Sequence, residues 1–159
     1  MATAKQPFHA ADLSGVPSAK GLRFAVVVAE WNGPITENLF AGAKETFLAL
    51  GALPDDVVRY NVPGAFELIY AAKTLLHQSD FFDAVVVIGC IIQGETAHFE
   101  YVCQGVTQGI ASLNTLGVAP VIFCVLTDKT EQHSLDRSGG KYGNKGTEAA
   151  IAAVKMARL

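Results

Sequence analysis

Runs of apolar residues along the chain alternate with segments that have helical spacing. Three runs are almost entirely apolar, at residues 22–29, 84–92 and 119–127, and they are rich in β-branched residues. Such runs are typical of strands covered on both faces, as in the middle of a parallel sheet. Residues 57–62 instead alternate apolar and polar side chains, which indicates a strand near the edge of the sheet.

The segments between these runs place apolar residues on one helical face. The spacing predicts helices from Ile35, from Ala65, over residues 97–116 and over residues 147–159, with a short helix within 128–136. Ser79 and Asp80 mark a turn before the longest apolar run. Strands that alternate with helices predict an α/β fold: a three-layer α/β/α sandwich around a four-stranded, flavodoxin-like parallel sheet of order 2-1-3-4.

Glycine shapes two segments of the predicted fold. Gly105 and Gly109 lie one turn apart in a predicted helix, which favours a close neighbour, either in the same subunit or in a partner. Residues 137–146 are too rich in glycine for a regular element, although they carry three cations.

The length and composition indicate a single domain with large subunit contacts. A chain of 159 residues suits one domain, which we expect over residues 22–159 behind an N-terminal arm of residues 1–21. Charged residues make up only 17%, against about 25% in an average soluble protein. This deficit indicates that much of the surface is covered by other subunits.

Charge and cysteine usage argue against several classes of partner. The net charge is −3, and the 12 basic and 15 acidic residues are intermixed, so we expect neither nucleic acid nor a membrane as a partner. No apolar run has the length of a secretion signal core or a membrane span, which predicts a cytoplasmic protein. The three cysteines lack C-x-x-C spacing, so we expect reduced thiols and no metal site.

Candidate chemistry follows the strands. Trp31 and Asn32, residues 64–67, residues 91–98 and Thr127 all stand where a predicted strand ends. The carboxyl ends of parallel strands meet at one edge of a sheet, where ligands bind. An aromatic ring, a carboxylate and an imidazole in this place predict a site for a flat heterocycle and a phosphorylated compound.

The phosphate prediction depends on the start of the helix after residue 92. Gly94, Glu95 and Thr96 precede it, and free N–H groups at a helix N-terminus attract anions. His98 follows closely, and this position favours the neutral imidazole, which can accept a proton.

Each of these residues also has a simpler explanation. Trp31 and Phe66 are equally typical of a core, Glu67 of a first helical turn, and Arg137 and Lys145 of a solvated surface. The remaining histidines are interpreted as structural or solvated; they are His9, His77 and His133.

Four blocks of residues resemble the signature of the lumazine synthase family, in the family's order. They are VPGAFE at 62–67, GCIIQGETAHFEYV at 89–102, PVIFCVLT at 120–127 and RSGGKYGNKGTEAA at 137–150. The resemblance runs from residue 22 to the C-terminus and does not cover the arm. It implies an enzyme of riboflavin biosynthesis that condenses a ribitylamino-pyrimidinedione with 3,4-dihydroxy-2-butanone 4-phosphate, without a cofactor.

The resemblance also implies roles for individual residues. His98 transfers the proton, while Glu95, Thr96 and Arg137 take the phosphate, with Arg137 coming from an adjacent subunit. Asn32, Lys145 and Glu148 have supporting roles. The pyrimidine and its ribityl chain are held by Trp31, Ala65, Phe66, Glu67, Cys90, Ile91, Ile92 and, from a neighbouring subunit, Phe123.

Family members form pentamers with active sites between subunits, and some build icosahedral shells of sixty subunits. The segment 139–145 has no insertion of the kind seen in pentamer-only relatives, which favours a shell. Four departures from the family pattern concern the shape of the pocket; they are Trp31, Cys90, Cys124 and Tyr142. Gln93 replaces a frequent arginine, so any charge that this arginine lends to the phosphate region is missing here. Two alternatives remain, a flavodoxin-like mononucleotide binder and a flavin-binding or shell-forming relative with weak catalysis.

Overall fold

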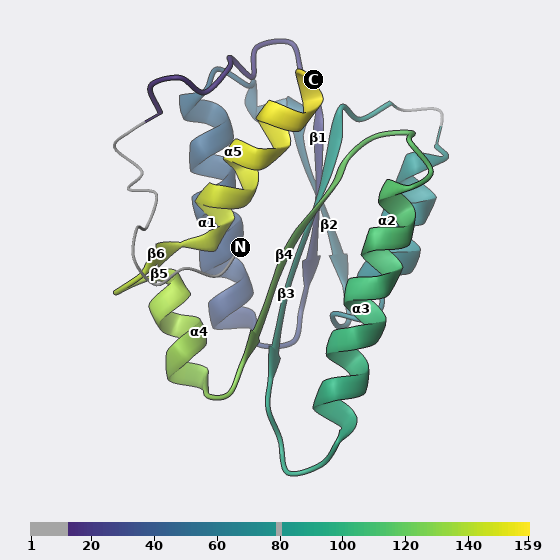
Figure 1. The fold of residues 1–159 in the computed structure, drawn as a ribbon. Helices are drawn as coiled ribbons and strands as arrows, with labels where there is room; N and C mark the ends of the chain where they lie inside the picture. Colours follow the sequence, from purple (N-terminus) through teal and green to yellow (C-terminus); the bar gives the residue numbers. More distant parts are fainter. Residues whose placement is uncertain (1–12, 79–80) are drawn as a thin grey trace.

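A four-stranded parallel sheet forms the middle layer of the chain. The computed structural model describes residues 13–78 and 81–159, so the first 12 residues of the predicted arm and the predicted turn at 79–80 lie outside the described residues. The sheet has the order β2-β1-β3-β4, as predicted (Figure 1). The strands are β1 (Phe24–Ala29), β2 (Val57–Val62), β3 (Ala84–Ile92) and β4 (Val121–Asp128).

Helices cover both faces of this sheet, which confirms the predicted three-layer α/β/α arrangement. Helices α1 (Gly33–Ala49), α4 (Glu131–Arg137) and α5 (Lys145–Ala157) lie on one face. Helices α2 (Leu68–Leu76) and α3 (His98–Asn114) lie on the other (Figure 1). None of the helices in the described ranges is long and apolar enough to cross a membrane.

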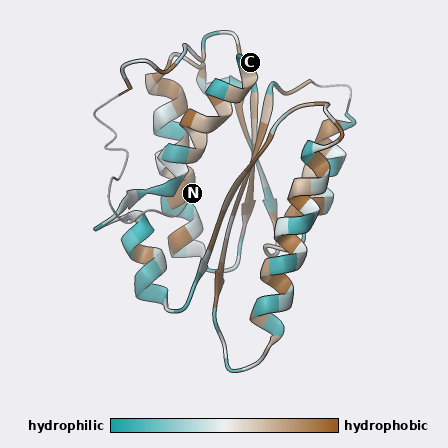
Figure 2. Cartoon of the chain, in the orientation of Figure 1, coloured by the Kyte–Doolittle hydropathy of each residue, from teal (hydrophilic) through white to brown (hydrophobic). Residues whose placement is uncertain are grey.

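Alternate side chains of the strands enter two separate cores, one under each helical layer. Phe24, Val26 and Val28 of β1 pack toward α1 and α5, and the ring of Phe24 stacks on Phe47 with centroids 4.1 Å apart. Ala25 and Val27 pack in the second core, under α2 and α3. The strands β1, β3 and β4 are accordingly hydrophobic over most of their length, whereas the end of β2 is hydrophilic and the helices carry both hydrophobic and hydrophilic residues (Figure 2).

The close approach between α2 and α3 decides between the two interpretations of the helical glycines. A Cβ atom on Gly105 would lie 2.9 Å from the ring of Phe66, and one on Gly109 would lie 2.5 Å from Cδ1 of Ile69. Both glycines therefore make room for residues of the same subunit.

Residues 13–21 pack against the domain itself. Ala19 is fully buried and its N–H donates to the carbonyl of Leu50 at 2.8 Å. Arg158 also donates from Nη2 to the carbonyl of Lys20 at 2.8 Å. These contacts hold the described part of the predicted arm, whereas the boundary at residue 22 stays a prediction.

The glycine-rich segment is more regular than its composition predicted. It contains an antiparallel pair, β5 (Ser138–Gly140) with β6 (Gly143–Asn144), and α5 begins at Lys145, two residues before the predicted start. The Asn144 side chain accepts a hydrogen bond from the N–H of Gly146 at 2.8 Å and so caps α5. The prediction of an irregular segment was therefore wrong, because side-chain capping orders it.

Gly146 provides a test of the packing between α1 and α5. A Cβ atom there would collide with the carbonyl oxygen of Leu39 and lie 2.7 Å from its carbonyl carbon. Because that obstacle is backbone, we expect Gly146→Ala to lower the free energy of unfolding by at least about 2 kcal/mol. Urea unfolding followed by circular dichroism measures the change. Gly33→Ala is the control, since nothing lies within 4 Å of its Cβ position; equal stability of the two variants would contradict this packing.

Candidate functional site

An open cavity of about 780 Å³ lies at the carboxyl ends of β1, β2 and β3, which is a typical size for a small-molecule site. Three turns that follow these strands build it, together with the start of α3. Ten of the predicted site residues line it: Trp31, Asn32, Ala65, Phe66, Glu67, Cys90, Ile91, Ile92, Thr96 and His98.

The turn after β1 presents the indole of Trp31 to this cavity. Asn32 adopts the left-handed backbone conformation (φ 58°), and its Nδ2 donates to the carbonyl of Cys90 at 2.8 Å. The N–H of Trp31 donates to the carbonyl of Pro63 at 3.1 Å. These bonds tie the turn to the ends of β3 and β2, so the turn that carries the indole has a fixed place.

Trp31 and Phe66 are not core residues. Their side chains are 74% and 55% exposed, and both line the cavity. Exposed aromatic rings on an open cavity provide flat apolar surfaces on which a heterocycle can stack. Glu67, which also lines the cavity, offers carboxylate oxygens that accept hydrogen bonds from N–H or hydroxyl groups.

The start of α3 forms the far wall of the cavity. Gly94, Thr96 and His98 line it, and the Thr96 hydroxyl oxygen accepts a hydrogen bond from the N–H of His98 at 3.4 Å. Helix α3 is 17 residues long, so its N-terminus carries the partial positive charge of an aligned helix. The wall therefore offers an anion a favourable place beside an imidazole.

Three further residues of α3 line the cavity although the sequence analysis did not include them in the site. They are Phe99, Tyr101 and Val102. Tyr101 is 73% exposed. It follows His98 by three residues, a spacing that places both side chains on one helical face, so this spacing could have predicted that Tyr101 belongs to the site.

Five predicted site residues do not line this cavity: Glu95, Phe123, Arg137, Lys145 and Glu148. Glu95 belongs to the same turn as Thr96, and Phe123 lies on the edge strand β4, where it is partly exposed. The other three belong to α4 and α5, on the opposite face of the sheet from α3 (Figure 1).

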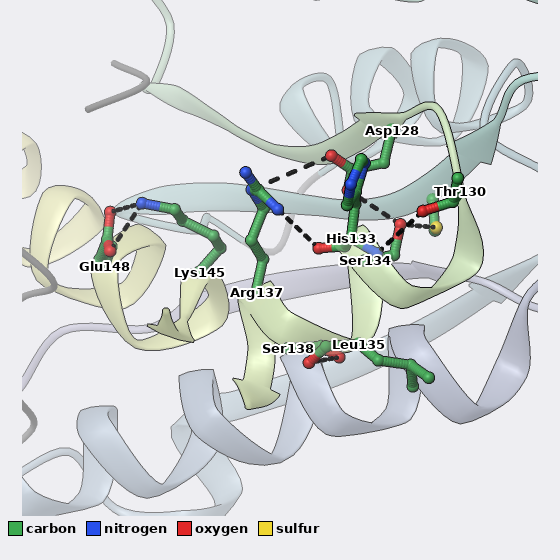
Figure 3. Close-up of polar contacts among 10 residues, drawn as sticks. Asp128, Thr130, His133, Ser134, Leu135, Arg137, Ser138, Lys145 and Glu148 are labelled. Atoms are coloured by element: carbon green, nitrogen blue, oxygen red, sulfur yellow. Dashed lines mark hydrogen bonds and ion pairs between the residues drawn. The ribbon is translucent and has the colours of Figure 1, made fainter. Parts of the chain in front are cut away.

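The cationic residues on that opposite face are engaged with nearby groups. Arg137 Nη1 donates to the carbonyl of His133 at 2.8 Å, and its Nε lies 3.9 Å from Oδ1 of Asp128 (Figure 3). Lys145 Nζ donates to both carboxylate oxygens of Glu148, at 2.8 and 2.7 Å (Figure 3). The chain thus presents a cavity at the ends of β1 to β3 and a separate cationic group across the sheet.

All three cysteines are free thiols, as predicted. Burial raises the pKa of Cys90, and its Sγ donates a hydrogen bond to Oγ of Ser134 at 3.3 Å. Burial, together with the charge of Glu148, raises the pKa of Cys124 to about 12. Both thiols are therefore neutral and weakly nucleophilic near neutral pH.

Comparison with known proteins identifies close relatives over the whole chain. The sequence model of the 6,7-dimethyl-8-ribityllumazine synthase family matches residues 21–159. A protein of that name from Flavobacterium psychrophilum is 56% identical over all 159 residues, which cover 84% of its length. Proteins of the same name from Flavobacterium johnsoniae and Porphyromonas gingivalis are 57% and 52% identical over the whole chain, which covers 83% and 98% of their lengths.

The burial and the raised pKa of Cys124 predict slow labelling of this thiol in the folded protein. Only an accessible thiolate reacts, so at pH 8 the folded protein should be alkylated at Cys124 at least about 100-fold more slowly than the urea-unfolded protein. Timed alkylation with iodoacetamide and mass spectrometry measures both rates. Equal rates for the folded and the unfolded protein would contradict the burial of this thiol.

Proposed function

Because the chain belongs to the 6,7-dimethyl-8-ribityllumazine synthase family, we propose that its cavity holds the pyrimidine substrate and that a neighbouring subunit completes the site. The chain is an enzyme of riboflavin biosynthesis, a transferase that makes 6,7-dimethyl-8-ribityllumazine. It condenses 5-amino-6-(D-ribitylamino)uracil with 3,4-dihydroxy-2-butanone 4-phosphate and releases phosphate and water. The reaction contains no net oxidation or reduction, so it requires no redox cofactor.

In the proposed site the pyrimidine ring stacks on Trp31 and lies against the turn after β2. The exposure of the indole on the cavity supports this placement, since a stacked ring covers apolar surface that water otherwise contacts. Glu67 accepts hydrogen bonds from the N–H or hydroxyl groups of the substrate. The residues at the end of β3, Cys90 to Ile92, form the floor beneath it.

One observation above all supports a site shared between subunits. Among residues 13–78 and 81–159, no lysine or arginine lines the cavity. A phosphate dianion there would have the N-terminus of α3 and no guanidinium or ammonium group. Arg137 is 31% exposed and lies on the other face of the sheet, where it can reach the cavity of an adjacent subunit. Phe123, on the exposed edge strand β4, can close that neighbouring cavity.

This arrangement requires a homo-oligomer with a site between each pair of adjacent subunits. The exposed aromatic residues of α2 and α3, Tyr70 and Tyr101, supply apolar surface for such contacts. The family resemblance supports a pentamer, and a shell of sixty subunits is the larger assembly that we propose. We likewise place the enzyme in the cytoplasm, as the sequence predicts.

The chemistry proceeds in three stages within this cavity. The free amine of the pyrimidine attacks the ketone, and loss of water gives an imine. A proton then leaves the adjacent carbon as the C–O bond to phosphate breaks, and the enol that results tautomerises to a second carbonyl. The ribitylamino nitrogen attacks this carbonyl, and the ring closes with loss of water. His98 lines the cavity beside the proposed phosphate position, so it is placed to move the proton in the second stage.

Replacement of His98 tests the proton-transfer role. We expect His98→Ala to slow turnover about 100-fold without abolishing it, because positioning of the two substrates provides catalysis of its own. The fluorescence of the lumazine formed from the two purified substrates measures the rate. His77→Ala is the matched control, since His77 is an exposed histidine outside the cavity.

Two results would contradict these assignments. A wild-type rate in His98→Ala would remove His98 from the mechanism. Binding of flavin without turnover by the wild-type protein would favour the alternative of a flavin-binding or shell-forming relative.

Mixed oligomers test whether each site uses two subunits. His98→Ala and Arg137→Ala subunits are each expected to be weakly active when assembled alone. When they are unfolded together and reassembled in equal amounts, about a quarter of the sites should combine an intact cavity with an intact Arg137 from the neighbour. Activity should therefore rise to about a quarter of the wild-type rate; no rise on mixing would place both residues in a site within one subunit.

A further inference from the structure

Arg137 is held in one direction before any ligand arrives. Its Nη1 donates to the carbonyl of His133, and its guanidinium carbon lies 5.1 Å from the centre of the Tyr142 ring. The third contact is the carboxylate of Asp128, whose Oδ1 lies 3.9 Å from Nε (Figure 3). At this distance the two groups form an ion pair without a hydrogen bond, so the Nε–H stays available to a ligand.

The Asp128 carboxylate is itself fixed. Its side chain is only 13% exposed, and its Oδ2 accepts a hydrogen bond from Oγ of Ser134 at 2.8 Å. Ser134 is fully buried and in turn accepts from Sγ of Cys90 at 3.3 Å. Asp128 is also the last residue of β4, where its carbonyl accepts from the N–H of Gln93 at 3.0 Å.

This network differs from an ordinary surface ion pair. An exposed pair contributes little, because two flexible side chains must be ordered and water screens their charges. Here the acidic partner is largely, though not fully, buried and is anchored to β3 and β4, so mainly Arg137 is ordered when the pair forms. The ion pair therefore acts mainly by fixing the direction in which the Arg137 guanidinium points.

We propose that Asp128 is a positioning residue that holds Arg137 in the orientation in which it receives the phosphate of the second substrate. The proposal rests on the phosphate role of Arg137 given above. Asp128 touches neither substrate in this proposal. Through Ser134 it connects the buried thiol of Cys90, at the floor of one cavity, to Arg137, the cation that serves the next cavity.

Two effects of the carboxylate oppose each other, and their balance can be measured. A negative charge beside Arg137 weakens its attraction for a phosphate dianion, whereas a fixed orientation lowers the ordering cost of binding. Water screens the first effect because Arg137 is partly exposed, while the second acts on every phosphate contact that the guanidinium makes. The proposal therefore predicts weaker phosphate binding when the carboxylate is removed.

The experiment uses Asp128→Asn in the full-length enzyme, with steady-state kinetics for both substrates and inhibition by inorganic phosphate. We expect the KM of the phosphorylated substrate and the inhibition constant of phosphate to rise about 3- to 10-fold, within the range of couplings in one network. The KM of the pyrimidine and kcat should change less than about twofold. In an Arg137→Ala background, Asp128→Asn should add no further weakening.

Control variants separate positioning from charge and from folding. Glu131→Gln removes the same charge from an exposed residue in the first turn of α4 and should leave all constants unchanged. Ser134→Ala keeps the Asp128 carboxylate but removes the hydroxyl that donates to it. This variant should give a smaller rise in the KM of the phosphorylated substrate and in the inhibition constant of phosphate. It also tests the positioning role if Asp128→Asn does not fold.

The outcomes distinguish the positioning role of Asp128 from the phosphate role of Arg137 on which it rests. If Arg137→Ala leaves the inhibition constant of phosphate unchanged, the phosphate role of Arg137 is wrong. If Arg137→Ala weakens phosphate binding but Asp128→Asn leaves it unchanged or tightens it, the positioning role is wrong. An equal rise in the KM of both substrates would also overturn it, because that pattern indicates a general disturbance of the subunit.

Discussion

Burial of β3 on both faces is the constraint on which the rest of the structure depends. Its first seven residues are buried, and it hydrogen-bonds to β1 on one side and β4 on the other. A strand without exposed side chains needs a helical layer above and below, and right-handed crossovers supply both. Gly89 lets the layer that contains α2 pack closely on the sheet, since a Cβ atom there would lie 3.1 Å from Cδ1 of Leu68. The end of β3 consequently forms the floor of the cavity.

The sequence predicted most of the fold because this constraint is visible as a pattern. Apolar, β-branched runs indicate the strands that helices cover on both faces, even though β4 lies at an edge of the sheet. Right-handed crossovers place helices on both faces, and the order of the sheet matches the flavodoxin-like choice. The pairing of β5 with β6 joins residues that are close in the chain, and it was missed because the glycine-rich composition predicts no regular element. The segment is also anchored by a hydrogen bond from Asn144 Nδ2 to the carbonyl of Asn38, 106 positions away, and composition carries no trace of such a contact.

The site was predictable to the extent that topology forces it. Trp31, Glu67 and His98 follow different strands, and a parallel sheet brings such residues to one edge whatever their side chains are. The surroundings of Arg137 were not predictable. Ser134 accepts a hydrogen bond from Cys90, 44 positions away, and a cysteine, a serine and an aspartate at such spacing form no recognised motif. Sequence patterns therefore locate the cavity but not the network that holds Arg137, the cation proposed to complete the cavity of a neighbouring subunit.

The separation of the cavity from the cations explains why one subunit is an incomplete enzyme in the proposed mechanism. A helix N-terminus stabilises an anion by about 0.3 to 2 kcal/mol, whereas each hydrogen bond to a charged group contributes about 1.5 to 3 kcal/mol. The described residues that line the cavity supply the first, but they include no lysine or arginine that could donate a hydrogen bond from a charged group. In the proposed mechanism, phosphate binding therefore depends on a guanidinium from the neighbouring subunit, which makes assembly a condition of catalysis.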